Sequence, residues 1–316
     1  FNDMYFFPDA TIDVCREVGM RASIGITIIE FESAWATSVD RYIEKGLVLL
    51  EAWGADPLVR FALSPHSPYT VSDDTLERIA ALSRERNLPV HMHLLETEWE
   101  IKQSYQQHDV HPVSRLEKHG LLNERLQAVH AVHTSAEDIE KIAAAGASVV
   151  HCPQSNLKLA SGFCPVGALL EAGINVAVGT DGAASNNDLD LLAETQTAAL
   201  LAKAVAGDAR VLDAGQALEM MTLNGARALG MAQDIGSIEV GKQADQCALD
   251  FATPATQPLH NVVSQLLYAA SSGQVSDVWV AGRRVLKSGQ LTTIDEREVL
   301  ASASQWRERL ARSDTA

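Results

Sequence analysis

The segment GTDGAASNNDLDLL, residues 179–192, decides how the fold of the whole chain is interpreted. It follows an apolar run ending in Val178, which is typical of a buried strand bounded by glycines. Asp181 comes where this strand ends, and a helix rich in Leu and Ala is expected at about 188–206. Catalytic and metal-binding groups of α/β enzymes lie at the carboxyl ends of parallel strands. The plainer alternative is that Asp181 caps the next helix.

The composition indicates a globular protein with a large core, because 47% of the 316 residues are apolar and 21% are charged. The formal charge is −16 and no cluster of Lys and Arg interrupts it, so we expect neither a nucleic acid nor a membrane as partner. The 4 cysteines are scattered without a CxxC pair. We therefore expect a cytoplasmic protein without a cysteine-based metal site.

Apolar runs alternate with amphipathic helical patterns along the first two thirds of the chain, which indicates a parallel sheet with crossover helices. The predicted strands are 22–28, 58–64, 88–94, 126–131, 147–151 and 174–180, and residues 1–3 end a possible further strand. The predicted helices are 9–18, 36–52, 73–86, 96–107, 112–119, 135–145, 165–172, 188–206 and 214–229. This order fits a (β/α)₈ barrel better than a doubly wound sheet, because no glycine-rich phosphate loop opens the first helix.

The alternation of apolar runs and helical patterns ends at about residue 232. Short β segments with glycine turns are expected at 236–251 and 275–291, with a helix at 259–271 between them and a charged helix at 295–312. We therefore expect the barrel in residues 1–232 and a small β-rich appendage with closing helices in 233–316.

Residues that can bind metal recur at the ends of five consecutive predicted strands. These residues are His66, His93, His130, His151 and Asp181, and Glu96 follows three residues after His93. In a barrel the carboxyl ends of the strands converge on one mouth. Imidazole and carboxylate together form a ligand set for Zn²⁺ or Fe²⁺, so the pattern predicts an active site there.

Each histidine also has a plainer explanation, since a lone strand histidine is more often part of the core than a ligand. Because side chains alternate along a strand, we expect only one of His91 and His93 to point into the barrel. His133 is expected to be a solvated loop residue, and His151 could bond neighbouring loops. The remaining histidines are expected at the surface: His108, His111, His119 and His260.

The motifs PHSPYT, HMHLLET, AVHAVH, HCPQSNLKLASGFCP and GTDGAASNNDLDLL, together with LNGARALG and GSIEVGKQAD in the tail, resemble the amidohydrolase superfamily in order and spacing. They look most like its 5′-methylthioadenosine/S-adenosylhomocysteine deaminases, a group related to the triazine hydrolases. The resemblance covers essentially the whole chain. It implies a TIM-type barrel with part of a β-sandwich.

The resemblance also implies a role for each matching residue. His93 and Asp181 resemble metal ligands, and Asp181 also takes the proton from the attacking water. Glu96 resembles the glutamate that binds the purine and moves protons, and His130 the histidine beside the attacking water. His66 resembles the residue on the substrate side of the site. The implied cofactor is one divalent metal ion, zinc with iron as the alternative.

Family members carry an HxH pair on the first strand, and this motif is absent here. We therefore expect the first strand and most of the second to lie outside this sequence, and the chain alone to fold poorly and bind metal weakly. The predicted reaction is deamination of an adenosine-type nucleoside: 5′-methylthioadenosine, S-adenosylhomocysteine or adenosine. The alternatives are a guanine or oxidised-purine deaminase, a triazine hydrolase, or an inactive remnant. A homo-oligomer, dimer or tetramer, is implied by the resemblance.

Overall fold

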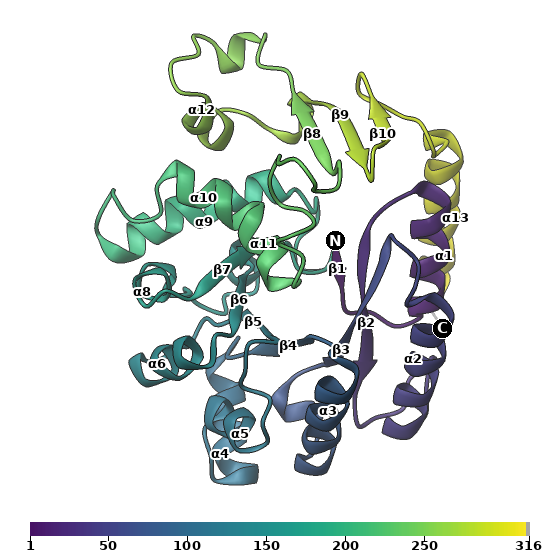
Figure 1. The fold of residues 1–316 in the computed structure, drawn as a ribbon, viewed down its shortest axis with the longest axis vertical. Coiled ribbons are helices and arrows are strands. Elements are labelled where there is room, and N and C mark those ends of the chain that lie inside the picture. Colours follow the sequence, from purple (N-terminus) through teal and green to yellow (C-terminus); the bar gives the residue numbers. More distant parts are fainter. Residues whose placement is uncertain (314–316) are drawn as a thin grey trace.

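The computed structural model describes residues 1–313 and contains two sheets. The larger one has seven strands that neighbour one another in chain order, β1 to β7, and every pairing is parallel. In Figure 1 these strands form an arc with helices on its outer side. This curled parallel sheet with helices outside it is the architecture of a (β/α) barrel, as the sequence predicted.

Each of the six predicted strands is present, with its ends shifted by at most two residues. The strands of the larger sheet are β1 (Asn2–Asp3), β2 (Ala22–Ile28), β3 (Val59–Pro65), β4 (Val90–Leu94), β5 (Leu126–His130), β6 (Ser148–His151) and β7 (Asn175–Val178). The prediction succeeded because these strands are covered on both faces and therefore read as apolar runs. All seven residues of β2, for example, are buried.

The helices also follow the prediction, with two exceptions. The segment 214–229 divides into two helices at Thr222, whose backbone is not helical. A short helix, α7, was not predicted. The helices of this part are α1 (Pro8–Val18), α2 (Val39–Trp53), α3 (Asp73–Arg86), α4 (Glu98–His108), α5 (Pro112–Lys118), α6 (Ala136–Ala145), α7 (Pro153–Lys158), α8 (Val166–Glu171), α9 (Leu191–Ala206), α10 (Ala214–Met221) and α11 (Leu223–Ala228).

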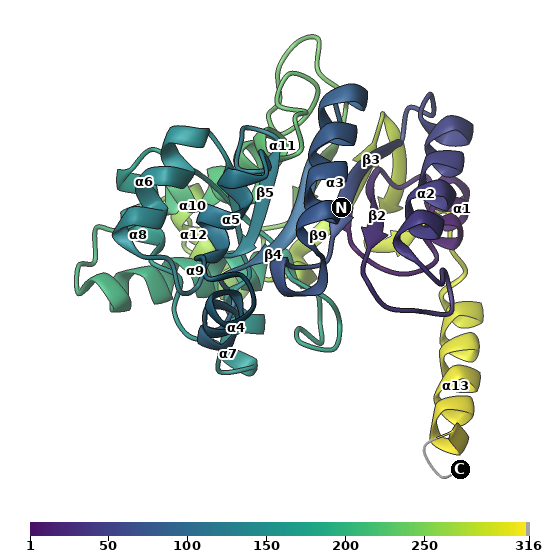
Figure 2. The same cartoon turned by 90° about the horizontal axis from the view of Figure 1, so that it is seen from below.

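The smaller sheet lies in the C-terminal part and is antiparallel, in the order β11-β10-β9-β8. Its elements are β8 (Gln246–Leu249), α12 (Val262–Tyr268), β9 (Val275–Val280), β10 (Arg283–Lys287), β11 (Gln290–Leu291) and the closing helix α13 (Glu296–Ser313). Figure 2 shows α13 extending away from the rest of the chain. The proposed domain boundary at residues 232 and 233 falls between α11 and β8. No helix within residues 1–313 combines the length and apolar character needed to cross a membrane.

Close packing of α2 on β2 depends on Gly46. A Cβ atom at this position would lie 2.1 Å from Cγ2 of Ile26, which is itself buried in β2. Glycine inside a helix costs up to about 1 kcal/mol relative to alanine. At this contact the steric demand outweighs the helix propensity, because an overpacked core loses about 1–3 kcal/mol.

We predict that Gly46→Ala lowers the free energy of unfolding by about 1–2 kcal/mol, because the new methyl group displaces Ile26 or the helix. The matched control is Gly225→Ala in α11, where a Cβ would meet no atom within 4 Å. That variant should be as stable as the wild type or slightly more stable. Urea unfolding measures both, and equal stability of the two variants would contradict the packing argument.

Candidate active site

Asp181 is not the cap of the following helix. Helix α9 begins ten residues later and is capped by Asp190, whose Oδ1 accepts hydrogen bonds from the backbone N–H groups of Leu192 and Ala193 at 2.9 and 3.1 Å. The plainer interpretation of Asp181 is therefore wrong. Its carboxylate is free to serve another purpose beyond the carboxyl end of β7.

Three neutral donors hold the Asp181 carboxylate. Oδ2 accepts from the hydroxyls of Ser155 at 2.6 Å and Ser185 at 2.7 Å, and Oδ1 accepts from the backbone N–H of Gly182 at 2.7 Å. Burial raises the pKa of Asp181, but these hydrogen bonds outweigh it and leave the pKa below its ordinary value. Asp181 is therefore held as a carboxylate.

The rings of His66, His93 and His130 lie together. The ring centroids of His93 and His130 are 5.4 Å apart in a stacked arrangement, and those of His66 and His93 are 4.9 Å apart. Nδ1 of His93 donates to the backbone carbonyl of His66 at 2.7 Å. This bond leaves the lone pair of Nε2 available, which is the tautomer that a metal-ligating histidine needs.

Glu96 reaches the same cluster from the turn that follows β4. Its Oε2 lies 3.7 Å from Nε2 of His130, and its Oε1 accepts from the Ser161 hydroxyl at 3.3 Å. Nδ1 of His130 accepts from the side-chain amide of Asn156 at 3.1 Å. Neutral His130 then carries its proton on Nε2, on the side that faces Glu96.

Burial separates the protonation states of these groups. It raises the pKa of Glu96 and favours its neutral acid form. Burial, with the neighbouring His93 as the second cause, lowers the pKa of His130 to about 3 and that of His66 to about 4. Near neutral pH His66 and His130 are thus neutral and Asp181 is ionised, while burial shifts Glu96 toward its acid form.

The backbone at two of these residues is strained. His130 and Asp181 have φ angles of 79° and 63°, which residues other than glycine rarely adopt. Leu95, directly before Glu96, has a φ of 55°. Each such residue costs on the order of 1–3 kcal/mol, and residues of this kind cluster at functional sites. The strain supports the interpretation of these strand ends as a site.

The expectation that only one of His91 and His93 points into the barrel is wrong. Residues two apart on a strand share a face, and the two ring centroids are 6.2 Å apart. His91 is buried deeper, where the side-chain amide of Asn2 from β1 lies 3.3 Å from its Nδ1. Burial lowers the pKa of His91 to about 3, so it is a neutral interior residue.

The other histidines are only partly as expected. His119 is buried rather than at the surface, and its two ring nitrogens lie 3.1 Å from Glu77 and 3.3 Å from Asp73. His133 is half-buried, and its Nε2 donates to the Ser161 carbonyl at 2.7 Å. His151 is buried, and within residues 1–313 its Nδ1 has no hydrogen-bond partner.

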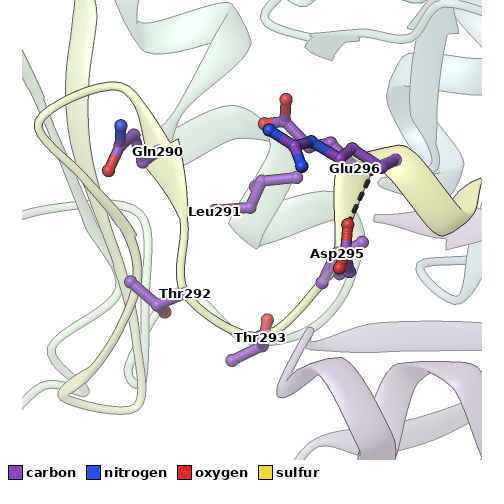
Figure 3. Close-up of a pocket in the computed structure, with 8 residues that line it drawn as sticks. Gln290, Leu291, Thr292, Thr293, Asp295 and Glu296 are labelled. Carbon is purple, nitrogen blue, oxygen red and sulfur yellow. Dashed lines mark hydrogen bonds between the residues drawn. The ribbon is translucent and has the colours of Figure 1, made fainter. Parts of the chain in front are cut away.

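The sequence predicted a divalent metal ion with His93 and Asp181 among its ligands. Within residues 1–313, no group of three or more His, Cys, Asp or Glu side chains is arranged to bind a metal ion. His93 nevertheless fits as one ligand because of its tautomer, and Asp181 fits as another because it is ionised. A surface pocket of about 570 Å³ lies elsewhere, lined entirely by residues 290–297 and by none of the predicted site residues (Figure 3).

The chain is similar to known proteins over nearly its whole length. The amidohydrolase family model matches residues 1–285, and the chain belongs to the amidohydrolase family. The 5-methylthioadenosine/S-adenosylhomocysteine deaminase of Teredinibacter turnerae is 51% identical over 310 residues, which are 98% of this chain and 70% of that protein. The enzyme of the same name from Saccharophagus degradans is 43% identical, over 97% of this chain and 69% of that protein.

Solved structures show the same relationship. An adenosine deaminase from Xanthomonas campestris with bound zinc superposes with a TM-score of 0.97 at 50% identity, over 98% of this chain and 71% of that one. Atrazine chlorohydrolase from Arthrobacter aurescens, complexed with zinc, has a TM-score of 0.90 at 25% identity, over 96% and 71% of the two chains.

The sequence analysis missed the residues that hold the predicted groups in place. Ser155 and Asn156 lie on the unpredicted helix α7, and Ser185 lies in the segment between β7 and α9. Glu100 on α4 was also missed. It is buried, and its carboxylate accepts from the backbone N–H groups of Leu95 at 2.9 Å and Glu96 at 3.1 Å. It therefore fixes the strained turn that carries Glu96.

We predict that Glu100 makes stability depend on pH. Burial raises its pKa from 4.5 to about 7, against the opposing effect of the two backbone hydrogen bonds. Between these pH values the folded state binds more protons than the unfolded state, so this contribution to the free energy of unfolding is present at low pH. It falls by about 3 kcal/mol as the pH rises through the window.

Denaturant unfolding of the wild type and Glu100→Gln at several pH values tests this dependence. The stability of the wild type relative to Glu100→Gln should fall from pH 4.5 to 7. Glu98→Gln, an exposed change on the same helix, should keep the wild-type pH dependence. A constant difference between wild type and Glu100→Gln across the window would contradict the shifted pKa.

Proposed function

We propose that this chain is a metal-dependent hydrolase that deaminates an adenosine-type nucleoside to the inosine-type product and ammonia. The substrates proposed are 5′-methylthioadenosine, S-adenosylhomocysteine and adenosine. One observation carries the proposal. Glu96 with a raised pKa, a neutral His130 and an ionised Asp181 lie together at the strand ends of a chain that is 51% identical to a 5-methylthioadenosine/S-adenosylhomocysteine deaminase.

Family membership supports a divalent metal cofactor, and we propose zinc, with His93 and Asp181 as two of its ligands. The zinc bound by the related Xanthomonas campestris structure supports that choice. When bound, the metal would supply the activation that lets water attack at neutral pH. A homo-oligomeric state, dimer or tetramer, and a cytoplasmic location stay predictions.

The chain's own residues account for the proton transfers. Asp181 accepts the proton of the attacking water, since its carboxylate is ionised. Glu96 donates a proton to N1 of the adenine ring, which removes negative charge as the tetrahedral centre forms at C6. His130 donates its Nε2–H to the attacking oxygen, and His66 contacts the substrate side of the site. Asp181 then passes the proton that it took from water to the amine, and the hydroxyl at C6 returns a proton to Glu96. The C6 carbonyl forms as ammonia leaves.

Turnover should depend on the acid at position 96. Glu96→Gln should lower kcat by a factor of about 100 or more, because an amide cannot donate and regain the proton. Bound metal should stay near the wild-type level. The measurement is ammonia release from a panel of adenosine-type nucleosides, guanine and triazines, with metal content by mass spectrometry.

The control for this variant is Glu98→Gln, which changes an exposed carboxylate in the same turn and should keep wild-type turnover. If Glu96→Gln also loses its metal, the division of roles between Glu96 and Asp181 is wrong. If only guanine releases ammonia, or only triazines are turned over, the proposed substrate class of adenosine-type nucleosides is wrong.

Metal binding should depend on His93. His93→Ala removes the imidazole whose Nε2 lone pair is free, so the affinity for zinc should fall by a factor of about 10 or more. His260→Ala, at an exposed position, serves as the control. Titration with zinc against a chromogenic chelator measures both, and equal affinities would contradict the role of His93 as a ligand.

A further inference from the structure

Glu194 is a buried carboxylate for which the proposed reaction has no direct use. Its side chain is 0% exposed on α9, in the first turn after the Asp190 cap. Among residues 1–313, no Lys, Arg or His side chain forms an ion pair with it. A buried charge without a counter-ion is costly unless hydrogen bonds replace its water. Burial accordingly raises the pKa of Glu194 to about 7.

The hydrogen bonds of Glu194 join two separate segments of the chain, the start of helix α7 and the loop after β7. Its Oε2 accepts from the backbone N–H of Gln154 at 3.0 Å, and its Oε1 accepts from the side-chain amide of Asn186 at 3.1 Å. Gln154 is also tied to α9 through its own side chain, which donates to the Thr197 hydroxyl at 3.0 Å. The start of α7 and the segment after β7 are therefore both fastened to one carboxylate.

Each fastened residue is next to a residue that holds a catalytic group. Ser155 follows Gln154 and Ser185 precedes Asn186, and the two serine hydroxyls converge on the same oxygen of Asp181. One residue further along α7, Asn156 holds Nδ1 of His130. A displacement of the Glu194 side chain would therefore also displace Asp181 and His130.

We propose that Glu194 is a positioning residue that sets the places of Asp181 and His130 by fixing helix α7 and the loop after β7, the two segments that hold them. This inference rests on the roles proposed above for those two residues. A plainer role, as the cap of α7, would explain only the bond to Gln154, because Cys152 at the start of that helix offers no side-chain cap. It would not explain the bond to Asn186.

The test compares Glu194→Gln with Thr195→Val in the full protein. Glu194→Gln keeps the size of the side chain but turns one acceptor into a donor, which then faces the N–H of Gln154 or the amide of Asn186. Thr195 is the adjacent residue, equally buried, and its hydroxyl bonds only within the helix, to the Leu191 carbonyl at 2.7 Å. Thr195→Val therefore perturbs α9 but leaves the hydrogen bonds of Glu194 to Gln154 and Asn186 in place.

Glu194→Gln should lower kcat by a factor of about 10–100, with KM within about threefold of the wild type, because misplacing the proton-transfer groups affects the chemical step. Thr195→Val should keep kcat even where it lowers the melting temperature. The inference is overturned if Glu194→Gln keeps kcat, or if the two variants lose kcat in proportion to lost stability.

Amide hydrogen exchange separates this inference from the proposed function. In Glu194→Gln, exchange should become faster in both residues 152–158 and residues 182–190, whereas Thr195→Val should leave both at the wild-type rate. If the wild type releases no ammonia from any nucleoside, the proposed function is wrong. The role of Glu194 in holding the two segments is then tested by amide hydrogen exchange alone. Faster exchange in both segments would then support the proposal that Glu194 holds them in place, and an unchanged rate in either segment would overturn it.

Discussion

The parallel register of β4 to β7 is the constraint on which the candidate site depends. His93 pairs with Val129 and Leu94 with His130, so the two histidines end neighbouring strands one residue out of register. The left-handed backbone of His130, with a φ of 79°, breaks the alternation of the strand, and the two ring centroids lie 5.4 Å apart. His151 pairs with Val178 at the end of β7, which places Asp181 just beyond the same rim. A slip of one residue in the pairing of β4 would turn His93 to the helix-covered face. The apolar runs that fix the register therefore also fix the chemistry.

Neutral donors, rather than cations, stabilise the carboxylates around this rim. Hydroxyls hold Asp181, backbone N–H groups hold Glu100, and amides hold Glu194. An added Lys or Arg would favour the charged form of every carboxyl group nearby, because Coulomb interactions reach far in a buried site. A hydrogen bond acts mainly on the atom that it touches. This difference allows the pKa of Asp181 to be lowered while that of Glu96 is raised.

The sequence was sufficient to predict the strands and the strand-end residues. Burial on both faces leaves long apolar runs, and a polar residue such as Asp181 is conspicuous at the end of one. It was not sufficient for the supporting residues. Ser155 and Asn156 are small polar residues in a helix of one and a half turns, which is too short to show a period. Their partners, Asp181 and His130, each lie 26 residues away, beyond any local pattern.

The supporting residues have a further physical purpose, because the strand ends they hold are strained. The positive φ angles of His130 and Asp181 together cost on the order of 2–6 kcal/mol. Each hydrogen bond to them contributes about 1 kcal/mol net, somewhat more where the acceptor is charged. The strained geometry therefore persists only if several donors act at once. Donors on mobile loops would lose much of this contribution to the entropy of ordering them. Glu194 holds α7 and the loop after β7 against one rigid helix, α9. The donors on these two segments are therefore already ordered, and less entropy is lost when they bind the strained strand ends.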